Sequence, residues 1–107
     1  ERLMHSYFQN QTSQLLREVD GETLFERAPA LAKARDKMGY FSNCIFSMTE
    51  GIHIEEFHNP LQHVFERFPS LERMEEQMFE KILEHPVKRT SDVRFGNCYY
   101  RFDILQS

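Results

Sequence analysis

Three histidines come closest, by type and spacing, to a chemical site. His53, His58 and His63 follow one another at intervals of five residues, with two glutamates between the first two. Imidazole and carboxylate groups are ligands for zinc and iron. The interval crosses a predicted strand, a loop and a helix, so it fits no metal motif built on a single element. Exposed or backbone-bonded histidines are the favoured interpretation, and a metal site using His58, His63 and Cys98 is the alternative.

The two cysteines, Cys44 and Cys98, are the thiols available for metal or redox chemistry. Each falls on the apolar side of a predicted strand, where cysteine behaves as a small hydrophobic residue. We therefore expect both to be buried, and a redox pair or a cofactor ligand is the alternative. Two widely spaced cysteines do not form a disulfide framework, so we expect a reducing, cytoplasmic location.

The sequence contains no recognisable catalytic nucleophile. None of the serines follows the strand–turn–helix pattern of a hydrolase. The four glycines all fit turns, and none belongs to a phosphate-binding loop. Adjacent carboxylates such as Glu75 and Glu76 point to different sides of a helix and indicate a solvated face. We therefore expect a protein that is not an enzyme.

Length and composition set the class of protein. A chain of 107 residues with 40% apolar and 28% charged residues is typical of one globular domain, here 1–107. The net charge of −4 argues against direct binding to a phosphate backbone. No apolar run of about 18 residues predicts a membrane span. Because the chain begins at Glu1 without a leader pattern, we expect it to be part of a longer cytoplasmic protein.

The first half predicts two helices and a hairpin. Apolar residues at helical spacing predict helices over 1–19 and 23–38, the second interrupted at Ala28 and Pro29 and closed by Gly39. After Gly39 the apolar residues recur at every second position, which is the spacing of a strand. The segments YFSNCIFSM and IHIEEF predict two strands joined by a turn at 49–51.

The second half predicts a divided helix and another hairpin. Asn59 suits an N-cap, Pro60 the first helical position and Gln62 the third position of a capping box. Pro69 must kink the helix or divide it into about 60–67 and 69–84. The alternating segment from Cys98 to Ile104 predicts a strand with Cys98, Tyr100, Phe102 and Ile104 in the core.

These elements predict an α+β fold in the order α-α-β-β-α-β-β. An antiparallel four-stranded sheet with helices on one face fits that order. The helix faces hold more apolar surface than such a sheet can cover, so we expect the 1–20 segment to lie at a homodimer interface. Space between the long helix and the sheet predicts a site for a small apolar ligand, lined by Phe46, Met74, Met78 and Tyr100.

A series of short patterns from Gly39 onward resembles a known family. These patterns are Gly39 and Tyr40; His58, Asn59 and Pro60; Phe68 and Pro69; Val87, Arg89 and Thr90; and Gly96, Cys98, Tyr99, Tyr100, Arg101 and Phe102. Their order and spacing are similar to the C-terminal domain of bacterial transcriptional regulators with an N-terminal winged helix of the ArsR/DeoR type. That group includes the repressor of iron–sulfur cluster biogenesis operons.

The resemblance implies a sensor and dimerisation domain that contacts DNA only through an upstream domain. Its signal would be a ligand or a redox change. Family members that hold an iron–sulfur cluster carry further cysteines, one directly after the His-Asn pair and another after the aromatic-Pro step. Here Pro60 and Leu71 lie at those places. Only Cys98 matches a family cysteine, and a conventional cluster needs about four ligands. The resemblance therefore predicts no cluster and no other cofactor. A metal-, haem- or cluster-dependent sensor or small enzyme using His58, His63 and Cys98 is the alternative.

Overall fold

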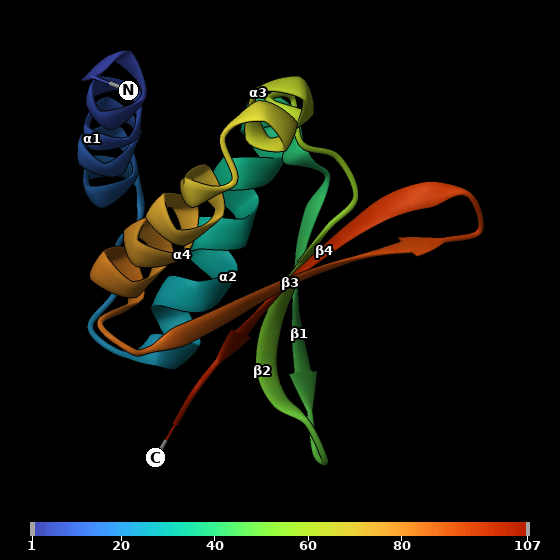
Figure 1. Ribbon diagram of the computed structural model, residues 1–107. Helices are drawn as coiled ribbons and strands as arrows, with labels where there is room; N and C mark the ends of the chain where they lie inside the picture. The colour runs from blue at the N-terminus through green and yellow to red at the C-terminus, as the bar shows by residue number, and fades with distance from the viewer. Residues whose placement is uncertain (1, 107) are drawn as a thin grey trace.

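The computed structural model describes residues 2–106 and shows one antiparallel sheet with its helices on one face (Figure 1). The strand order is β1-β2-β4-β3, which confirms the predicted fold class and element order. The elements are α1 (Arg2–Glu18), α2 (Leu24–Arg35), a wide helical turn η1 (Asp36–Tyr40), β1 (Ser42–Ser47), β2 (Gly51–Glu56), α3 (Gln62–Arg67), α4 (Ser70–Leu83), β3 (Val87–Arg94) and β4 (Asn97–Ile104).

Helix α2 runs without a break through Pro29, so the predicted interruption there is wrong. A capping box starts the helix, because the Glu26 carboxylate accepts hydrogen bonds from the backbone N–H groups of Glu22 and Thr23 at 2.9 and 3.2 Å. Ala28 is fully buried beside Pro29. Capping and burial therefore outweigh the one helical hydrogen bond that proline cannot make.

Pro69 divides the later helix into α3 and α4, as predicted. The start of α3 differs from the prediction, because Asn59 caps a separate turn ahead of the helix. Its Oδ1 accepts a hydrogen bond from the N–H of Leu61 at 2.9 Å. Gln62 does not complete a capping box, because its Oε1 accepts a hydrogen bond from the hydroxyl of Tyr100 at 2.5 Å. A tertiary contact therefore replaces the local one.

The core lies between the helices and the sheet. Phe79 of α4 stacks on Phe102 of β4 with ring centroids 3.9 Å apart, and both side chains are fully buried. Tyr100 and Ile104 are also buried, as predicted for this strand. Cys98 shares their face but is exposed, so its predicted burial is wrong. The β3–β4 hairpin projects beyond the helices, which leaves its tip uncovered (Figure 1).

Carboxylates of α4 cap the outer edge of the sheet at β3. Glu80 accepts a hydrogen bond from the N–H of Val87 at 2.9 Å, and Glu76 accepts one from the N–H of Arg89 at 2.7 Å. A free strand edge offers unpaired backbone donors to other chains. These carboxylates satisfy two of those donors within the domain. Among residues 2–106, no helix combines the length and apolar character needed to cross a membrane.

Candidate functional site

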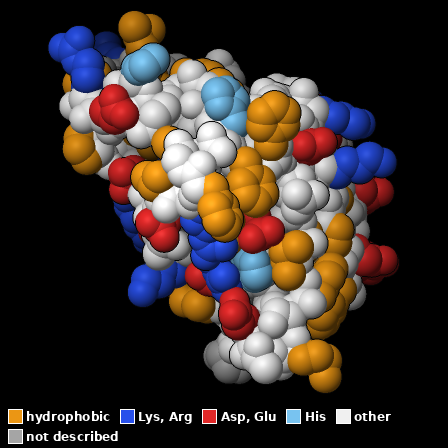
Figure 2. Space-filling model, turned by 90° about the vertical axis from the view of Figure 1, so that its right-hand side faces the viewer, with side chains coloured by type: hydrophobic (Ala, Val, Ile, Leu, Met, Phe, Trp, Pro, Cys, Tyr) orange, Lys and Arg blue, Asp and Glu red, His pale blue; other side chains and the backbone are white. Residues whose placement is uncertain are grey.

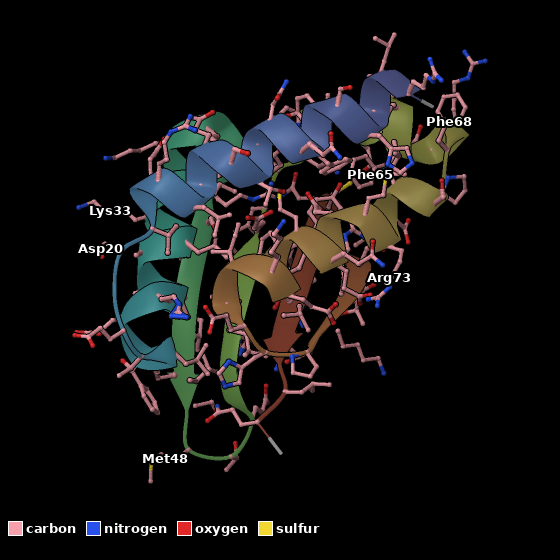
Figure 3. The ribbon with its side chains drawn as sticks, turned by 90° about the vertical axis from the view of Figure 1, so that its left-hand side faces the viewer. Asp20, Lys33, Met48, Phe65, Phe68 and Arg73 are labelled. Carbon is pink, nitrogen blue, oxygen red and sulfur yellow. The ribbon has the colours of Figure 1, made fainter. Side chains whose placement is uncertain are left out.

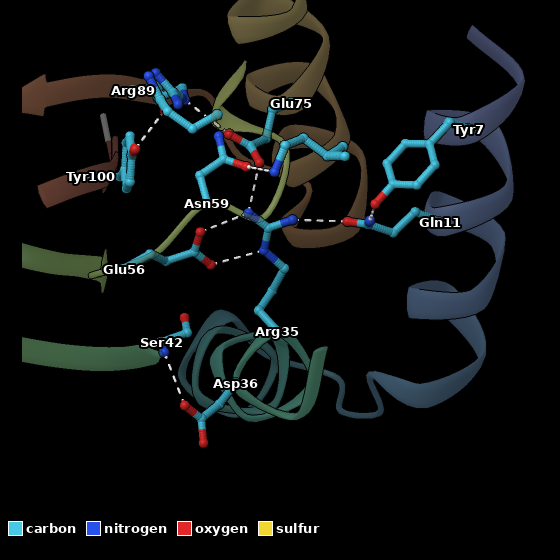
Figure 4. A network of polar contacts seen from close by, with 12 residues as sticks. Tyr7, Gln11, Arg35, Asp36, Ser42, Glu56, Asn59, Glu75, Arg89 and Tyr100 are labelled. Atoms are coloured by element: carbon cyan, nitrogen blue, oxygen red, sulfur yellow. Dashed lines mark hydrogen bonds and ion pairs between the residues drawn. The ribbon is translucent and has the colours of Figure 1, made fainter. Parts of the chain in front are cut away.

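A buried arginine lies at the centre of the molecule. Arg35, the last residue of α2, donates from Nε and Nη2 to the two carboxylate oxygens of Glu56 at 2.8 and 2.6 Å (Figure 4). Nη2 also donates to Glu75 at 2.7 Å, and Nη1 donates to Gln11 at 2.8 Å. The planar guanidinium group is suited to such forked pairing. One side chain therefore joins α1, α2, β2 and α4.

Arg89 extends this set of contacts to β3. Its Nε donates to the second oxygen of Glu75 at 2.9 Å, and its guanidinium carbon lies 5.2 Å from the Tyr100 ring centre. The Tyr40 ring lies against Arg35 at 3.5 Å. Cations gain energy over aromatic faces. We call Gln11, Arg35, Glu56, Glu75 and Arg89 the Arg35 cluster; its two arginines balance its two glutamates.

The Arg35 cluster is enclosed. The side chains of Arg35, Glu56 and Glu75 are no more than 2% exposed. Burial alone would lower the pKa of Arg35, but the adjacent carboxylates raise it above its ordinary value. Burial raises the pKa of Glu56, and Arg35 opposes that effect without cancelling it. Because no substrate can reach these groups without opening the core, the cluster positions the helices and is not a reaction site.

The sequence interpretation missed this cluster. It assigned Glu75 to a solvated face, whereas the side chain is 2% exposed and paired with two arginines. The signal that could have shown its burial is helical position. Glu75 falls four residues after the buried Leu71, and Gln11 falls three after the buried Phe8. Polar residues in an apolar stripe need buried partners.

A groove runs between α1 and α4, which lie side by side in Figure 3. Its volume is about 560 Å³. The α1–α4 groove is lined by His5, Phe8, Gln9, Asn10, Thr12, Ser13, Leu16, Met74, Gln77, Met78 and Lys81. The lining contains no acidic residue, so Lys81 is its one fixed charge.

A second depression of about 360 Å³ lies where α3 meets the projecting hairpin. We call it the Asn59 pocket; its lining is Phe57, His58, Asn59, Pro60, Gln62, His63, Gly96, Asn97, Cys98 and Tyr100. The predicted metal ligands His58, His63 and Cys98 therefore share one pocket. Within residues 2–106, however, no group of three or more His, Cys, Asp or Glu side chains is arranged to hold a metal ion.

The predicted ligand-lining residues lie in three separate places. Met74 and Met78 both line the α1–α4 groove, and Tyr100 lines the Asn59 pocket. Phe46 stacks on Phe25 near the tip of the first hairpin and lines a third depression of about 300 Å³. Cys44 is half-buried, and burial raises the pKa of its thiol to about 11, which disfavours the reactive thiolate.

The face of the sheet without helices is covered by its own side chains (Figure 2). Arg101 donates to Glu50 at 2.6 Å and to Asp103 at 2.9 Å. Tyr99 packs on Phe57 and is 3% exposed. Charged groups of both signs therefore lie beside aromatic rings on this face.

Comparison of the chain with protein-family models, curated proteins and solved structures found no match in any of the three.

Proposed function

We propose that this chain is a non-catalytic sensor and dimerisation domain of a bacterial transcriptional regulator, with a small apolar ligand in the α1–α4 groove. The observation that carries the proposal is the groove itself: about 560 Å³ between the first helix and the rest of the domain. That volume lies in the range of small-molecule sites. The family resemblance supports the regulatory role.

The lining indicates the ligand class. Met74 and Met78 provide a polarisable apolar floor, and methionine adapts its shape to flexible ligands. Phe8 and Leu16 of α1 cover the opposite side. Lys81 provides a positive charge with no carboxylate in the lining to neutralise it. Polar side chains, among them Gln9, Ser13 and Gln77, form the rest of the lining. An acyl chain with a carboxylate head, which is apolar at one end and polar at the other, suits this mixed lining.

Ligand occupancy would act on α1. The helix is joined to the domain by apolar contacts and by the hydrogen bond between Gln11 and Arg35 at 2.8 Å. A ligand between α1 and α4 would favour one placement of α1 over others, which is a population shift. An upstream winged helix joined to α1 would then present a different half-site spacing to DNA.

Titration with decanoate tests the site. We expect saturable binding that perturbs the NMR signals of Met74, Met78 and Lys81. Lys81→Glu is expected to weaken decanoate binding by at least about tenfold, because it replaces attraction by repulsion. Lys88→Glu is the matched control, since Lys88 is exposed on β3 outside the groove. Equal weakening by both variants would exclude a specific role for Lys81, and an absence of binding would remove the proposed site.

The surface of α1 supports self-association. The run from Leu3 to Leu16 contains no Asp, Glu, Lys or Arg, and Leu3 and Tyr7, one turn apart on the same face of α1, are 84% and 37% exposed. Depletion of charge is characteristic of interface cores. In an antiparallel pair of α1 helices, Arg2 of one copy would lie beside Glu18 of the other. Twofold symmetry would form this ion pair at both ends of the contact. A twofold dimer through α1 follows from this self-complementarity.

Sedimentation velocity tests the dimer. The wild-type chain is expected to sediment as a dimer at micromolar concentration. Leu3→Glu is expected to convert it to a monomer, because it places a charge in the contact. Leu105→Glu changes another exposed leucine, 49% exposed near the other end of the chain, and is expected to leave the dimer intact. A monomeric wild type, or dissociation by both variants, argues against pairing through α1.

A metal- or haem-dependent sensor or small enzyme is the second candidate. The observation that favours it is the shared position of His58, His63 and Cys98 around one pocket. Nitrogen and thiolate ligands suit zinc and iron. Elemental analysis and a visible absorption spectrum of anaerobically purified protein test it. A folded, colourless and metal-free protein would rule this candidate out.

A further inference from the structure

The two edges of the sheet differ in how their backbone groups are satisfied. At the β3 edge, carboxylates of α4 accept two backbone N–H groups. β1 forms the other edge and pairs with β2 alone. Edge strands are commonly protected by charged side chains or by proline. The sequence of β1, SNCIFS, contains neither.

The hydrogen bonds next to β1 show which of its backbone groups point away from β2. The N–H of Phe57 donates to the carbonyl of Phe41 at 3.2 Å, which continues the β1–β2 register by one pair. Hydrogen-bonded and non-hydrogen-bonded pairs alternate along an antiparallel ladder. Ser42, Cys44 and Phe46 therefore lie in non-hydrogen-bonded pairs, and they direct both their N–H and their C=O groups towards the outer edge.

One of these three positions is capped within the domain. The N–H of Ser42 donates to Asp36 Oδ1 at 3.1 Å (Figure 4). Within residues 2–106, no hydrogen bond joins the backbone of Cys44 or Phe46 to an element other than β2. Their N–H and C=O groups lie two residues apart, a spacing of about 7 Å along a strand. An extended strand with the same repeat completes this pattern of donors and acceptors.

The side chains at this edge are apolar. Phe46 is 53% exposed and stacks on Phe25 of α2, and Ile45 on the other face of the sheet is 36% exposed. Residues directly opposite each other on paired strands pack together. We propose that β1 binds an extended, uncharged segment of a partner protein as a fifth strand. The added strand is antiparallel, like the other pairs of this sheet, and places an apolar residue opposite Phe46.

A second copy of the chain is a less suitable occupant than such a segment. Each copy has a net charge of −4, and β1 has no basic side chain to offset the repulsion between two copies. A partner segment brings only its own residues to the edge. The β1 edge also shares no residue with the lining of the α1–α4 groove, so this proposal does not depend on decanoate binding there.

The test uses the full chain and the synthetic peptide acetyl-Thr-Val-Thr-Val-Thr-amide, with backbone hydrogen exchange followed by NMR. At saturating peptide, exchange at Cys44 and Phe46 is expected to slow at least about tenfold, because the peptide protects the N–H groups that face it. Exchange at Asn43 and Ile45 is expected to change little, since these N–H groups face β2 already. Protection that follows the β3 edge instead would overturn the proposal.

Two N-methylated peptides separate strand pairing from apolar adhesion. Valines opposite Cys44 and Phe46 share both the face and the hydrogen-bonding positions of those residues. Methylation of the two valine nitrogens is therefore expected to weaken binding at least about tenfold, whereas methylation of the last two threonine nitrogens, which face away, is expected to change it less than about threefold. Equal affinities of the two methylated peptides would overturn the proposal.

A charged variant tests the edge from the side of the protein. Phe46→Lys is expected to weaken binding of the unmethylated peptide at least about tenfold, because it places a charge where the apolar residue packs. Val93→Lys makes the same change at a residue of β3 that is 66% exposed, and is expected to leave binding within about threefold. Equal weakening, or slow exchange at Cys44 and Phe46 that increases with the concentration of the free chain, would overturn the proposal. If Phe46→Lys does not fold, the methylated peptides decide on the wild type.

Discussion

Replacing Arg35 by methionine is expected to lower the free energy of unfolding by about 3–5 kcal/mol, because the buried carboxylates of Glu56 and Glu75 lose their shared counter-ion. The loss should appear as a lower urea midpoint, or as an unfolded chain. Arg73→Met is the control, because Arg73 is 57% exposed and pairs with Glu76 at the surface. That change is expected to leave the urea midpoint almost unchanged, because solvent screens an exposed ion pair. Equal losses in the two variants would show that the Arg35 cluster does not hold the helices together.

Two further measurements separate charge from packing at Arg35. Adding Glu56→Met to Arg35→Met should recover most of the loss, because Glu75 still pairs with Arg89 at 2.9 Å. Lowering the pH should also reduce the loss of unfolding free energy that Arg35→Met causes on its own. Burial already raises the pKa of Glu56, and removing Arg35 removes the group that opposes this rise. The folded variant therefore takes up a proton at a pH where the unfolded chain does not, so its relative stability increases as the pH falls towards about 4.

Replacing Phe79 by alanine is expected to lower the free energy of unfolding by about 3–5 kcal/mol. The ring is fully buried, stacks on Phe102 and lies 5.0 Å from the guanidinium carbon of Arg35. Its removal leaves a cavity between α4 and the sheet. Phe68→Ala is the matched control, since Phe68 is 38% exposed at the end of α3, and should cost less than about 1 kcal/mol. Similar urea midpoints for the two variants would contradict this packing.

Local signals predicted the architecture well. Pro69 lacks the N–H that a continuous helix needs, so the division into α3 and α4 follows from its chemistry. The alternation of Tyr100, Phe102 and Ile104 predicted the face of β4 that meets the helices. Periodicity does not show how far along a strand the helices cover the sheet. Cys98 keeps the same parity as Tyr100 and is exposed, because the end of the hairpin projects beyond the helices (Figure 1).

Long-range polar contacts could not be predicted in the same way. Arg35 and Glu75 are far apart in sequence, and each resembles an ordinary charged residue on a helix until the fold brings them within 2.7 Å. The candidate ligand residues show the same effect. Met74 and Met78 are one helical turn apart and share a groove, whereas Phe46 and Tyr100 depend on where two hairpins project and lie elsewhere.

Amide hydrogen exchange of α1 tests the sensor account most directly. In the free chain, α1 is expected to exchange faster than the core strands, because its partially exposed face has few buried contacts. Saturating decanoate is predicted to slow exchange across Arg2–Glu18 while exchange at the exposed tip of the β3–β4 hairpin stays unchanged. Binding of decanoate with no change in α1, or protection confined to another part of the molecule, would contradict the proposal that occupancy of the groove fixes this helix.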